Sequence, residues 1–362
     1  MRHRFLLVIL LVAALPAWAA QPASVSYYEC LRCAQPPVID GNLDDPCWQK
    51  LPQMDQFFKY WTPTPELPPL QTAARLCYDD RGLYLGITMY KDQLDKIKAT
   101  VDSRDNPLTW MDDCVEVMVD PANGGTGYYK FCTNYNAARY DERATNMVLD
   151  SGWNVEGWQV KTARAKGGWA IEFFFPWADL EHRPAPGDIW SFALVRYGWA
   201  SGGFKGVSWS LGGAGAHPAQ FGYLGFGPFS EQTLPRLARA AVTTKGQSLR
   251  LLRPELVLTC ERGQWQREDL RRWLRGTLRA VDADLEAVRA ALLTLTVGAD
   301  RDRLQDGLEQ QMTKLNELRA QAGGAQVPTV TAALIDHEAL LLRQRASDLR
   351  YEALLLGLVA RS

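Results

Sequence analysis

A tryptophan and three polar residues lie within one short part of the chain and together suit the binding of a sugar ring. Trp110 precedes two runs of alternating polar and apolar residues, and Glu116, Lys130 and Asn134 fall on the same face of these runs. An indole packs against the C–H face of a sugar ring, and fixed polar groups bond to its hydroxyls. The alternative interpretation is that Trp110 belongs to the core and the acidic residues lie on a solvated edge.

A β-hairpin is predicted to position these residues. Residues 114–120 and 128–134 both alternate with the period of two that is typical of a half-buried strand. The sequence between them, Pro-Ala-Asn-Gly-Gly-Thr-Gly, cannot continue a strand and indicates a loop. One face of the predicted hairpin is therefore apolar, and the other face carries the polar residues.

Carboxylates near the start of this hairpin raise the alternative of glycoside hydrolysis. Asp112, Asp113 and Glu116 can supply the two carboxyl groups that hydrolysis of an O-glycosyl bond needs. Asp113 and Glu116 lie on opposite faces of the predicted strand, however, which argues against an acid and a base that face each other. The sequence has no Ser/His/Asp, phosphate-loop or zinc-hydrolase motif. We therefore predict a protein without catalytic residues.

The length and charge of the chain narrow the classes of function. The chain has 362 residues, which suggests about two domains, and 47% of them are hydrophobic, which is ample for packed cores. A formal net charge of -1 gives no support for nucleic-acid binding or for a polybasic membrane surface. We expect neither a nucleic-acid partner nor an integral membrane protein.

The N-terminus has the pattern of a secretory signal peptide. Basic residues precede the apolar run at residues 5–15, and Ala17-Trp18-Ala19 matches an A-x-A cleavage site. Neither this run nor the apolar run at residues 354–359 is long enough to span a bilayer. Residues 1–19 are therefore predicted to be removed, and the mature protein is predicted to be secreted to the extracellular space or the periplasm.

Seven cysteines follow the predicted signal peptide, and export permits disulfides. Cys114 and Cys132 share a face of the two predicted strands and can be bridged, although free buried thiols are the alternative. Cys30 and Cys33 form half of a zinc or redox motif, but no second pair completes it. A local disulfide, or a pairing with Cys47, is therefore predicted there. The odd number leaves at least one thiol unpaired in a monomer.

Further short strands are predicted before residue 230. They lie at residues 74–78, 83–90, 158–163, 169–175, 189–196, 206–210 and 221–226, with turns rich in glycine and proline between them. This pattern indicates an antiparallel β-sandwich, which we place at residues 26–229.

The composition changes near residue 230, where aromatic residues become rare. Residues 230–264 are interpreted as a linker or an extended tether. From Trp265 onwards, apolar residues step by threes and fours, and Gly298 and Gly323 end two predicted helices. Residues 265–362 are therefore predicted to form an antiparallel three-helix bundle or a coiled coil. Its apolar stripe serves either a self-contained bundle or self-association and docking on a protein partner.

Several motifs in the predicted sandwich occur together and in order, and by them residues 36–227 resemble the family 9 carbohydrate-binding module. The motifs are Val38-Ile39-Asp40-Gly41, Asp45-Pro46-Cys47-Trp48, Leu83-Tyr84-Leu85, Trp110 to Asp120, Tyr128-Tyr129-Lys130-Phe131, Gly168-Trp169-Ala170-Ile171-Glu172, Pro176-Trp177, Ser208-Trp209-Ser210 and Phe221-Gly222-Tyr223-Leu224. The resemblance implies a β-sandwich from a secreted bacterial system that degrades polysaccharides of the xylan or cellulose type. The helical region lies outside the resemblance.

The resemblance also implies where sugar binds. Members of the family that bind sugar hold it between two tryptophans, which correspond to Trp110 and Trp209. Glu116 and Asn134 match two further sugar contacts of the family. This implies a clamp of two indoles with polar groups around it.

Part of the family's polar shell is replaced in this chain. Cys132 stands where the family has an arginine, and Val195 stands where it has a glutamine. We expect Lys130, Arg139 or Arg196 to supply the missing polar groups.

The resemblance further implies structural calcium, which binds oxygen-rich loops. Asp92 matches one ligand of the family, while Gly198 stands at the position of its partner. Asp102, Asp105 and Asp120 are other candidates, although solvated surface acids are the alternative for each. No organic cofactor is expected.

Two further functions are consistent with the same sandwich. A degenerate sugar site would leave a non-catalytic scaffold that assembles a complex through its helices. A haem-binding relative would need ligands, for which His182 and His217, with Met111 or Met118, are the candidates in this domain.

Overall fold

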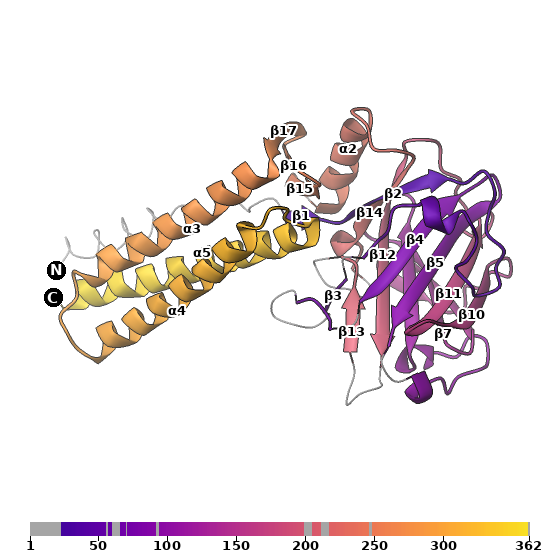
Figure 1. The fold of residues 1–362 in the computed structure, drawn as a ribbon, viewed down its shortest axis with the longest axis horizontal. Coiled ribbons are helices and arrows are strands. Elements are labelled where there is room, and N and C mark those ends of the chain that lie inside the picture. Colours follow the sequence, from indigo (N-terminus) through magenta and orange to yellow (C-terminus); the bar gives the residue numbers. More distant parts are fainter. Residues whose placement is uncertain are drawn as a thin grey trace.

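A β-sandwich and a projecting bundle of helices make up the part of the chain that we describe here (Figure 1). The structure is a computed structural model, and it describes residues 23–360 except 56, 60–65, 70, 92–93, 199–204, 211–216 and 246–247. The predicted signal peptide and Asp92 lie outside these residues.

The strands of the sandwich form one hydrogen-bonded path that curls into two facing layers. One layer contains, in spatial order, β10 (Gln159–Ala165), β11 (Gly168–Pro176), β5 (Gly82–Tyr90) and β4 (Thr72–Tyr78). The other contains β14 (Gly222–Phe226), β12 (Ile189–Gly198), β6 (Cys114–Asp120), β7 (Tyr128–Asn134), β8 (Arg139–Thr145) and β9 (Val148–Asp150). β13 (Lys205–Ser208) pairs with β12 and with β3 (Phe58–Lys59).

β2 (Tyr27–Arg32) joins the two layers. Its first residues pair in parallel with β14 through four register positions, and its last two residues pair in parallel with β4. The other pairings within the two layers are antiparallel. β2 is therefore the strand through which one layer continues into the other.

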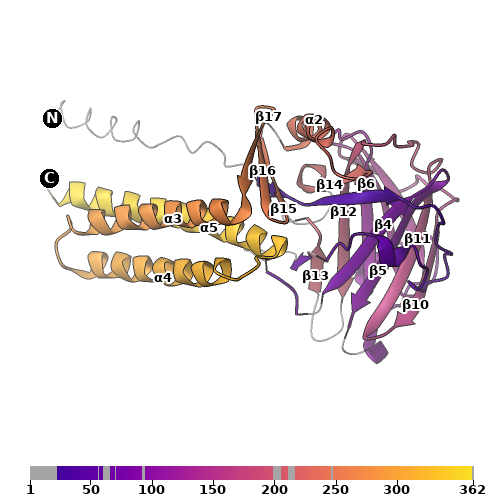
Figure 2. The same cartoon turned by 45° about the horizontal axis from the view of Figure 1, so that its top comes forward.

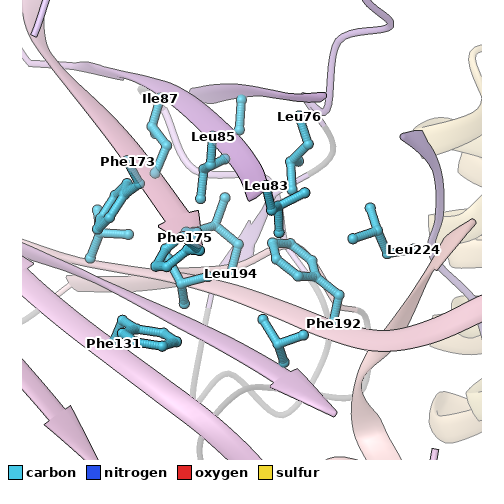
Figure 3. Close-up of a cluster of buried hydrophobic side chains, with 14 of the residues drawn as sticks. Leu76, Leu83, Leu85, Ile87, Phe131, Phe173, Phe175, Phe192, Leu194 and Leu224 are labelled. Carbon is cyan, nitrogen blue, oxygen red and sulfur yellow. The ribbon is translucent and has the colours of Figure 1, made fainter. Parts of the chain in front are cut away.

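The core of the sandwich lies between these layers (Figure 3). Leucine and phenylalanine side chains of β5 and β11 meet apolar side chains of β6, β7 and β12, and these residues are almost completely buried. The alternation of Val115, Val117 and Val119 places all three in this core, so the outer face of β6 carries Cys114, Glu116 and Met118. The predicted hairpin is therefore present, with the bounds that the alternation indicates.

The stretch at residues 230–264 is a folded part of the structure, which corrects its interpretation as a linker. It contains α2 (Thr233–Lys245), β15 (Ser248–Arg253) and β16 (Leu256–Glu261). These two strands form a small sheet with β17 (Gln264–Asp269) and with β1 (Ala23–Val25), which pairs in parallel with β15. Leu237 of α2 packs against Leu249 and Leu258 of this sheet, so apolar burial holds the segment in place.

The helical region consists of α3 (Leu270–Leu292), α4 (Ala299–Ala322) and α5 (Thr329–Val359), which share one apolar core. Trp265 lies in β17, and the first helix begins at Leu270, where the Asp269 side chain accepts a hydrogen bond from the backbone of Arg272 at 2.8 Å. The bundle projects away from the sandwich, and its far end contains the C-terminus of α5 (Figures 1 and 2).

The predicted fold class, a β-sandwich followed by an α-helical bundle, is confirmed. Within the described part of the chain, no helix is both long and apolar enough to span a membrane. The described residues also contain four short 3-10 helices: η1 (Trp48–Lys50), η2 (Leu94–Lys96), η3 (Thr109–Met111) and η4 (Pro218–Gln220).

Candidate functional site

A partly buried lysine between two glutamates forms the centre of the candidate site. Lys130 on β7 lies directly opposite Glu142 on β8, and Glu116 lies on the neighbouring strand β6. The Lys130 Nζ atom is 2.8 Å from Glu116 Oε1 and 3.2 Å from Glu142 Oε1. Since the same face of all three strands carries these side chains, the hairpin pattern in the sequence is enough to bring Glu116 and Lys130 together.

Two tyrosines extend this arrangement across four strands. The hydroxyl of Tyr197 on β12 donates to Glu116 Oε2 at 3.1 Å, and the hydroxyl of Tyr140 on β8 donates to Glu142 Oε2 at 2.7 Å. We call these five side chains the carboxylate–lysine row. Each glutamate is held by two donors, so the row is rigid before any ligand arrives.

The electrostatics of the row keep Lys130 charged. Burial by itself would lower the pKa of Lys130, but the nearby carboxylates of Glu116 and Glu142 raise it overall. Two carboxylates and one ammonium give the row a formal charge of -1. Lys130 Nζ also lies 5.9 Å from the centroid of the Tyr140 ring, and among the residues that the structure describes no third oxygen acceptor contacts it, which leaves one N–H for a ligand.

A buried hydroxyl lies close to the row without a hydrogen-bond partner. Tyr128 is 97% buried, and its hydroxyl oxygen has no partner in the described structure. Burial raises the pKa of Tyr128 to about 12, and the charges of Glu142, Lys130 and Glu116 act on it. An unsatisfied buried hydroxyl next to charged groups is a place where a ligand hydroxyl or a water gains a hydrogen bond.

Trp110 provides an exposed aromatic side chain just before β6, the strand that carries Glu116. It belongs to η3, and its side chain is 43% exposed. Its carbonyl accepts a hydrogen bond from Cys114 Sγ at 3.5 Å, and Cys114 packs with Cys132 on the outer face of β6 and β7. Trp110 is therefore not a core residue, and part of it is accessible to a ligand.

Trp209 does not form the second wall of a clamp, which corrects the expectation from the resemblance. It is 3% exposed and packs edge-to-face on Phe192 in the core, with ring centroids 5.7 Å apart. Gly222 lies against the same indole, because a Cβ atom there would approach it to 2.7 Å. Trp209 therefore fills the sandwich and has no free face for a sugar.

Asn134 is occupied by the protein itself. Its Nδ2 donates to the Val101 carbonyl at 2.7 Å and to Asp112 Oδ2 at 2.8 Å, while its Oδ1 accepts from the backbone of Asn136 and Ala138 at 3.1 Å. These bonds fix two loops at the end of β7. Asn134 is therefore a structural residue and does not present a free group to a sugar.

The two aspartates before β6 are also occupied. Asp112 accepts hydrogen bonds from the backbone of Thr100 and Val101, and Asp113 forms a buried ion pair of 2.9 Å with Lys91. Burial would raise the pKa of Asp112, but these hydrogen bonds lower it overall. Neither carboxyl group is available as the acid of a hydrolase.

The two arginines expected near the sugar lie elsewhere. Arg139 covers the Trp158 ring at 4.8 Å and donates to the Val155 carbonyl at 3.1 Å. Arg196 alternates with Val195 on β12 and donates to the Tyr90 carbonyl at 2.9 Å, and burial lowers its pKa to about 10. Of the three cations expected from the sequence, only Lys130 belongs to the row.

Three of the carboxylates named for calcium lie in the described part of the chain. Asp102 is exposed, and Asp120 accepts a hydrogen bond from the Gly125 amide at 3.1 Å within the β6–β7 loop. No group of three or more His, Cys, Asp or Glu side chains within the described ranges is arranged to hold a metal ion. Calcium binding through Asp92, Asp102, Asp105 or Asp120 stays a prediction.

All seven cysteines lie in the described part of the chain, and all are free thiols there. The disulfides predicted among Cys30, Cys33, Cys47, Cys114 and Cys132 are therefore not formed in this structure. Cys114 and Cys132 do share a face, and their thiols are hydrogen-bonded to each other.

Sequence reasoning missed Glu142, Tyr140, Tyr197 and Tyr128. The first two lie on β8, whose residues are polar on both faces, so no strand was predicted there. The signal that would have found Glu142 is its spacing from Tyr140 and Ala144, which share its face.

Glu172, which carries part of the family resemblance, has a structural role. Its Oε2 accepts from the backbone amides of Asp40 and Gly41 at 2.9 and 2.8 Å, and its Oε1 accepts from Trp48 Nε1 at 2.9 Å. These bonds tie the segment before η1 to β11. Several motif residues therefore specify the sandwich and not a ligand.

Comparison with known proteins finds a family model that matches most of this sandwich. Residues 39–209 match the model of the family described as "Carbohydrate family 9 binding domain-like". Over 201 residues the chain is 25% identical to Endo-1,4-beta-xylanase A of Thermotoga neapolitana and to the enzyme of the same name from Thermotoga maritima. The alignment covers 52% of this chain and 17% of each xylanase, so the chain spans about a sixth of the length of these relatives.

Solved structures were also matched. A carbohydrate binding module family 9 from Caldicellulosiruptor kristjanssonii, solved in complexes with cellotriose and with glucose, is 18% identical to this chain. The matches have TM-scores of 0.42 and 0.43 and cover 57% of this chain and 96% and 98% of that module. Residues 39–209 of the sandwich domain therefore match the carbohydrate family 9 binding domain-like family, and the helical region is outside the match.

Proposed function

We propose that the protein is a secreted, non-catalytic carbohydrate-binding protein that holds a sugar between the Trp110 side chain and the carboxylate–lysine row. The observation that carries this proposal is an exposed indole on η3, directly before β6, together with the polar row on the outer face of β6, β7 and β8. A sugar stacked on Trp110 can accept a hydrogen bond from the free N–H of Lys130 and can donate to the glutamate oxygens.

We further propose that the protein assists enzymes that break down xylan-type polysaccharides. The support for this role is the match to the two xylanases, which is restricted to 17% of their length. Secretion is supported by the signal-peptide pattern at residues 1–19. One indole and a few hydrogen bonds that compete with water suit dissociation constants in the micromolar to millimolar range, about -8 to -4 kcal/mol.

Titration calorimetry of the mature protein tests this proposal. The ligands are glucose, cellobiose, xylobiose and soluble xylan, and the variant is Trp110→Ala. We expect at least one ligand to bind, and we expect the variant to bind it about tenfold more weakly, because stacking contributes on the order of 1 to 3 kcal/mol.

Tyr351→Ala is the matched control, because Tyr351 is an aromatic residue on α5 with 42% exposure, close to that of Trp110. We expect it to bind sugar like the wild type. A folded protein that gives no heat with any of the four ligands contradicts the proposal.

The second candidate function is a scaffold that acts through its helices. It is favoured by the apolar residues Leu354, Leu355 and Val359, which are exposed on the last turns of α5. In that case the sugar site of the sandwich is degenerate, and the bundle docks on a protein partner or on a second copy of this chain. Light scattering of the wild type and of Leu355→Glu tests self-association. If the helices self-associate, the wild type is a dimer and the variant is a monomer.

A further inference from the structure

Two buried cysteines meet where β2 joins β4. Cys33 directly follows β2, and its backbone amide donates to the Tyr78 carbonyl at 2.9 Å. Cys77 lies on β4, opposite Leu31. The thiols of Cys33 and Cys77 are hydrogen-bonded to each other, and Cys33 Sγ also lies 3.4 Å from the Tyr78 carbonyl oxygen.

This contact lies beside the shorter of the two pairings that join the layers, that of β2 with β4. β2 is the strand that connects the two layers, and only Leu31 and Arg32 pair with β4, whereas four register positions join β2 to β14. A covalent bond from Cys33 to β4 would add a cross-link at the shorter of the two pairings. It would also close a chain loop between residues 33 and 77, which restricts the unfolded state.

We propose that Cys33 and Cys77 form a disulfide when the protein meets a disulfide oxidant, and that this bond joins the two layers of the sandwich. The other cysteines nearby are poorer partners. Cys30 is buried in the sandwich core, and Cys47 packs at the edge of the cluster that contains Cys33 and Cys77. Neither has a thiol contact with Cys33 like that of Cys77.

The chemistry requires one two-electron oxidant, a small-molecule or protein disulfide. The Cys33 thiolate attacks one sulfur of that disulfide and releases its other half as a thiolate. Cys77 then loses its proton, and its thiolate attacks Cys33 Sγ and releases the second half. Two protein thiols are oxidised, one disulfide is reduced to two thiols, and the two protons pass to the released thiolates.

The surroundings assign the roles of the two cysteines in this exchange. Cys33 is 8% exposed and Cys77 is completely buried, so Cys33 meets the oxidant first. The hydrogen bond from the Cys77 thiol lowers the pKa of Cys33, which favours its thiolate, and the same bond raises the pKa of Cys77.

Peptide mapping of the full chain tests the proposal. The purified protein is equilibrated with oxidised and reduced glutathione, free thiols are blocked with iodoacetamide, and trypsin cuts after Arg32, Lys50, Arg75 and Arg81. We expect peptide 33–50 to be joined to peptide 76–81, with Cys47 alkylated. The proposal is overturned by a disulfide within peptide 33–50, by a bond from peptide 33–50 to the peptide that ends at Arg32, or by complete alkylation of Cys33 and Cys77.

Two variants and a melting measurement provide the control. Cys47→Ser keeps the cross-link and the effect of reductant, whereas Cys33→Ser loses both. In the wild type, we expect reductant to lower the melting temperature by at least about 4 °C. If reductant lowers the melting temperature of Cys33→Ser equally, the bond lies elsewhere and the proposal fails.

Discussion

At the scale of single residues, the position of Lys130 sets the electrostatics of the candidate site. Its ammonium group forms ion pairs with both Glu116 and Glu142, and both glutamates are buried. A ligand at this face meets groups that already hold one another, so binding needs little reorganisation. The same arrangement makes the row sensitive to the loss of its single cation.

The variant Lys130→Met tests this dependence. It leaves two buried carboxylates without their cation, so we expect a loss of about 3 kcal/mol in the free energy of unfolding, measured with urea. Lys314→Met is the matched control, because Lys314 forms an exposed pair with Glu317 at 3.6 Å, and it should change stability by less than about 0.5 kcal/mol. Equal effects of the two variants would contradict the account of the row.

The raised pKa of Lys130 also predicts a pH dependence. Because the folded-state pKa lies above the unfolded value of about 10.4, the contribution of Lys130 is complete below that pH and is lost as pH rises above it. The stability difference between wild type and Lys130→Met should therefore be constant from about pH 7 to 9 and shrink between about pH 10.4 and 11.5. A difference that grows with pH contradicts this sign.

At this scale the sequence predicts some contacts and not others. Glu116 and Lys130 can be paired from the alternation of two strands, because a face is fixed by the pleat. The burial of Trp209 depends on Phe192 and Gly222, which meet it only through tertiary packing. The hydrogen bond from Asn134 to Asp112 could not be predicted either, because it depends on the exact path of two loops.

At the scale of elements, the sandwich core explains why one tryptophan is structural and the other is exposed. Trp209 follows β13 and fills the space beside β12, whereas Trp110 lies on a short 3-10 helix outside the layers. We expect Trp209→Ala to lower the free energy of unfolding by about 3 to 5 kcal/mol, measured by urea denaturation. Trp110→Ala should lower it by less than about 0.5 kcal/mol. Similar losses for the two variants would show that the assignment is wrong.

Elements with a clear period are the ones that the sequence predicts. β6 and β7 have strict alternation and a glycine-rich loop between them, and α3 has a long apolar stripe. β8 has polar residues on both faces, and the small sheet of β1, β15, β16 and β17 is assembled from distant segments. Because β1 supplies its strand from the start of the chain, no local pattern near residue 250 indicates that sheet.

At the scale of the whole molecule, one buried ion pair connects the helices to the strands beside the sandwich. Arg250 on β15 is 2.6 Å from Asp336 on α5, and both side chains are nearly buried. The hydroxyl of Ser24 on β1 also donates to Asp336, and the Arg250 guanidinium covers the Trp273 ring at 4.8 Å. The orientation of the bundle is therefore fixed by specific contacts at its base.

Asp336→Ala should weaken this connection. It leaves the Arg250 guanidinium buried without a carboxylate, so we expect a loss of about 3 kcal/mol and earlier unfolding of the helices, measured by circular dichroism during urea titration. The control is Asp282→Ala, which removes an exposed partner of Arg319 at 3.0 Å. If the two variants unfold alike, the junction does not depend on this pair.

The central claim is that a sugar stacks on Trp110, and nuclear magnetic resonance of the indole N–H groups tests it most directly. The Trp110 signal is assigned by its absence from Trp110→Ala, and the Trp48 indole, which is bound to Glu172, serves as an internal reference. During a titration with cellobiose or xylobiose, we predict that the Trp110 signal shifts with the ligand concentration while the Trp48 signal stays in place. A Trp110 signal that does not move at saturation, while other signals do, would place the sugar elsewhere and contradict the account.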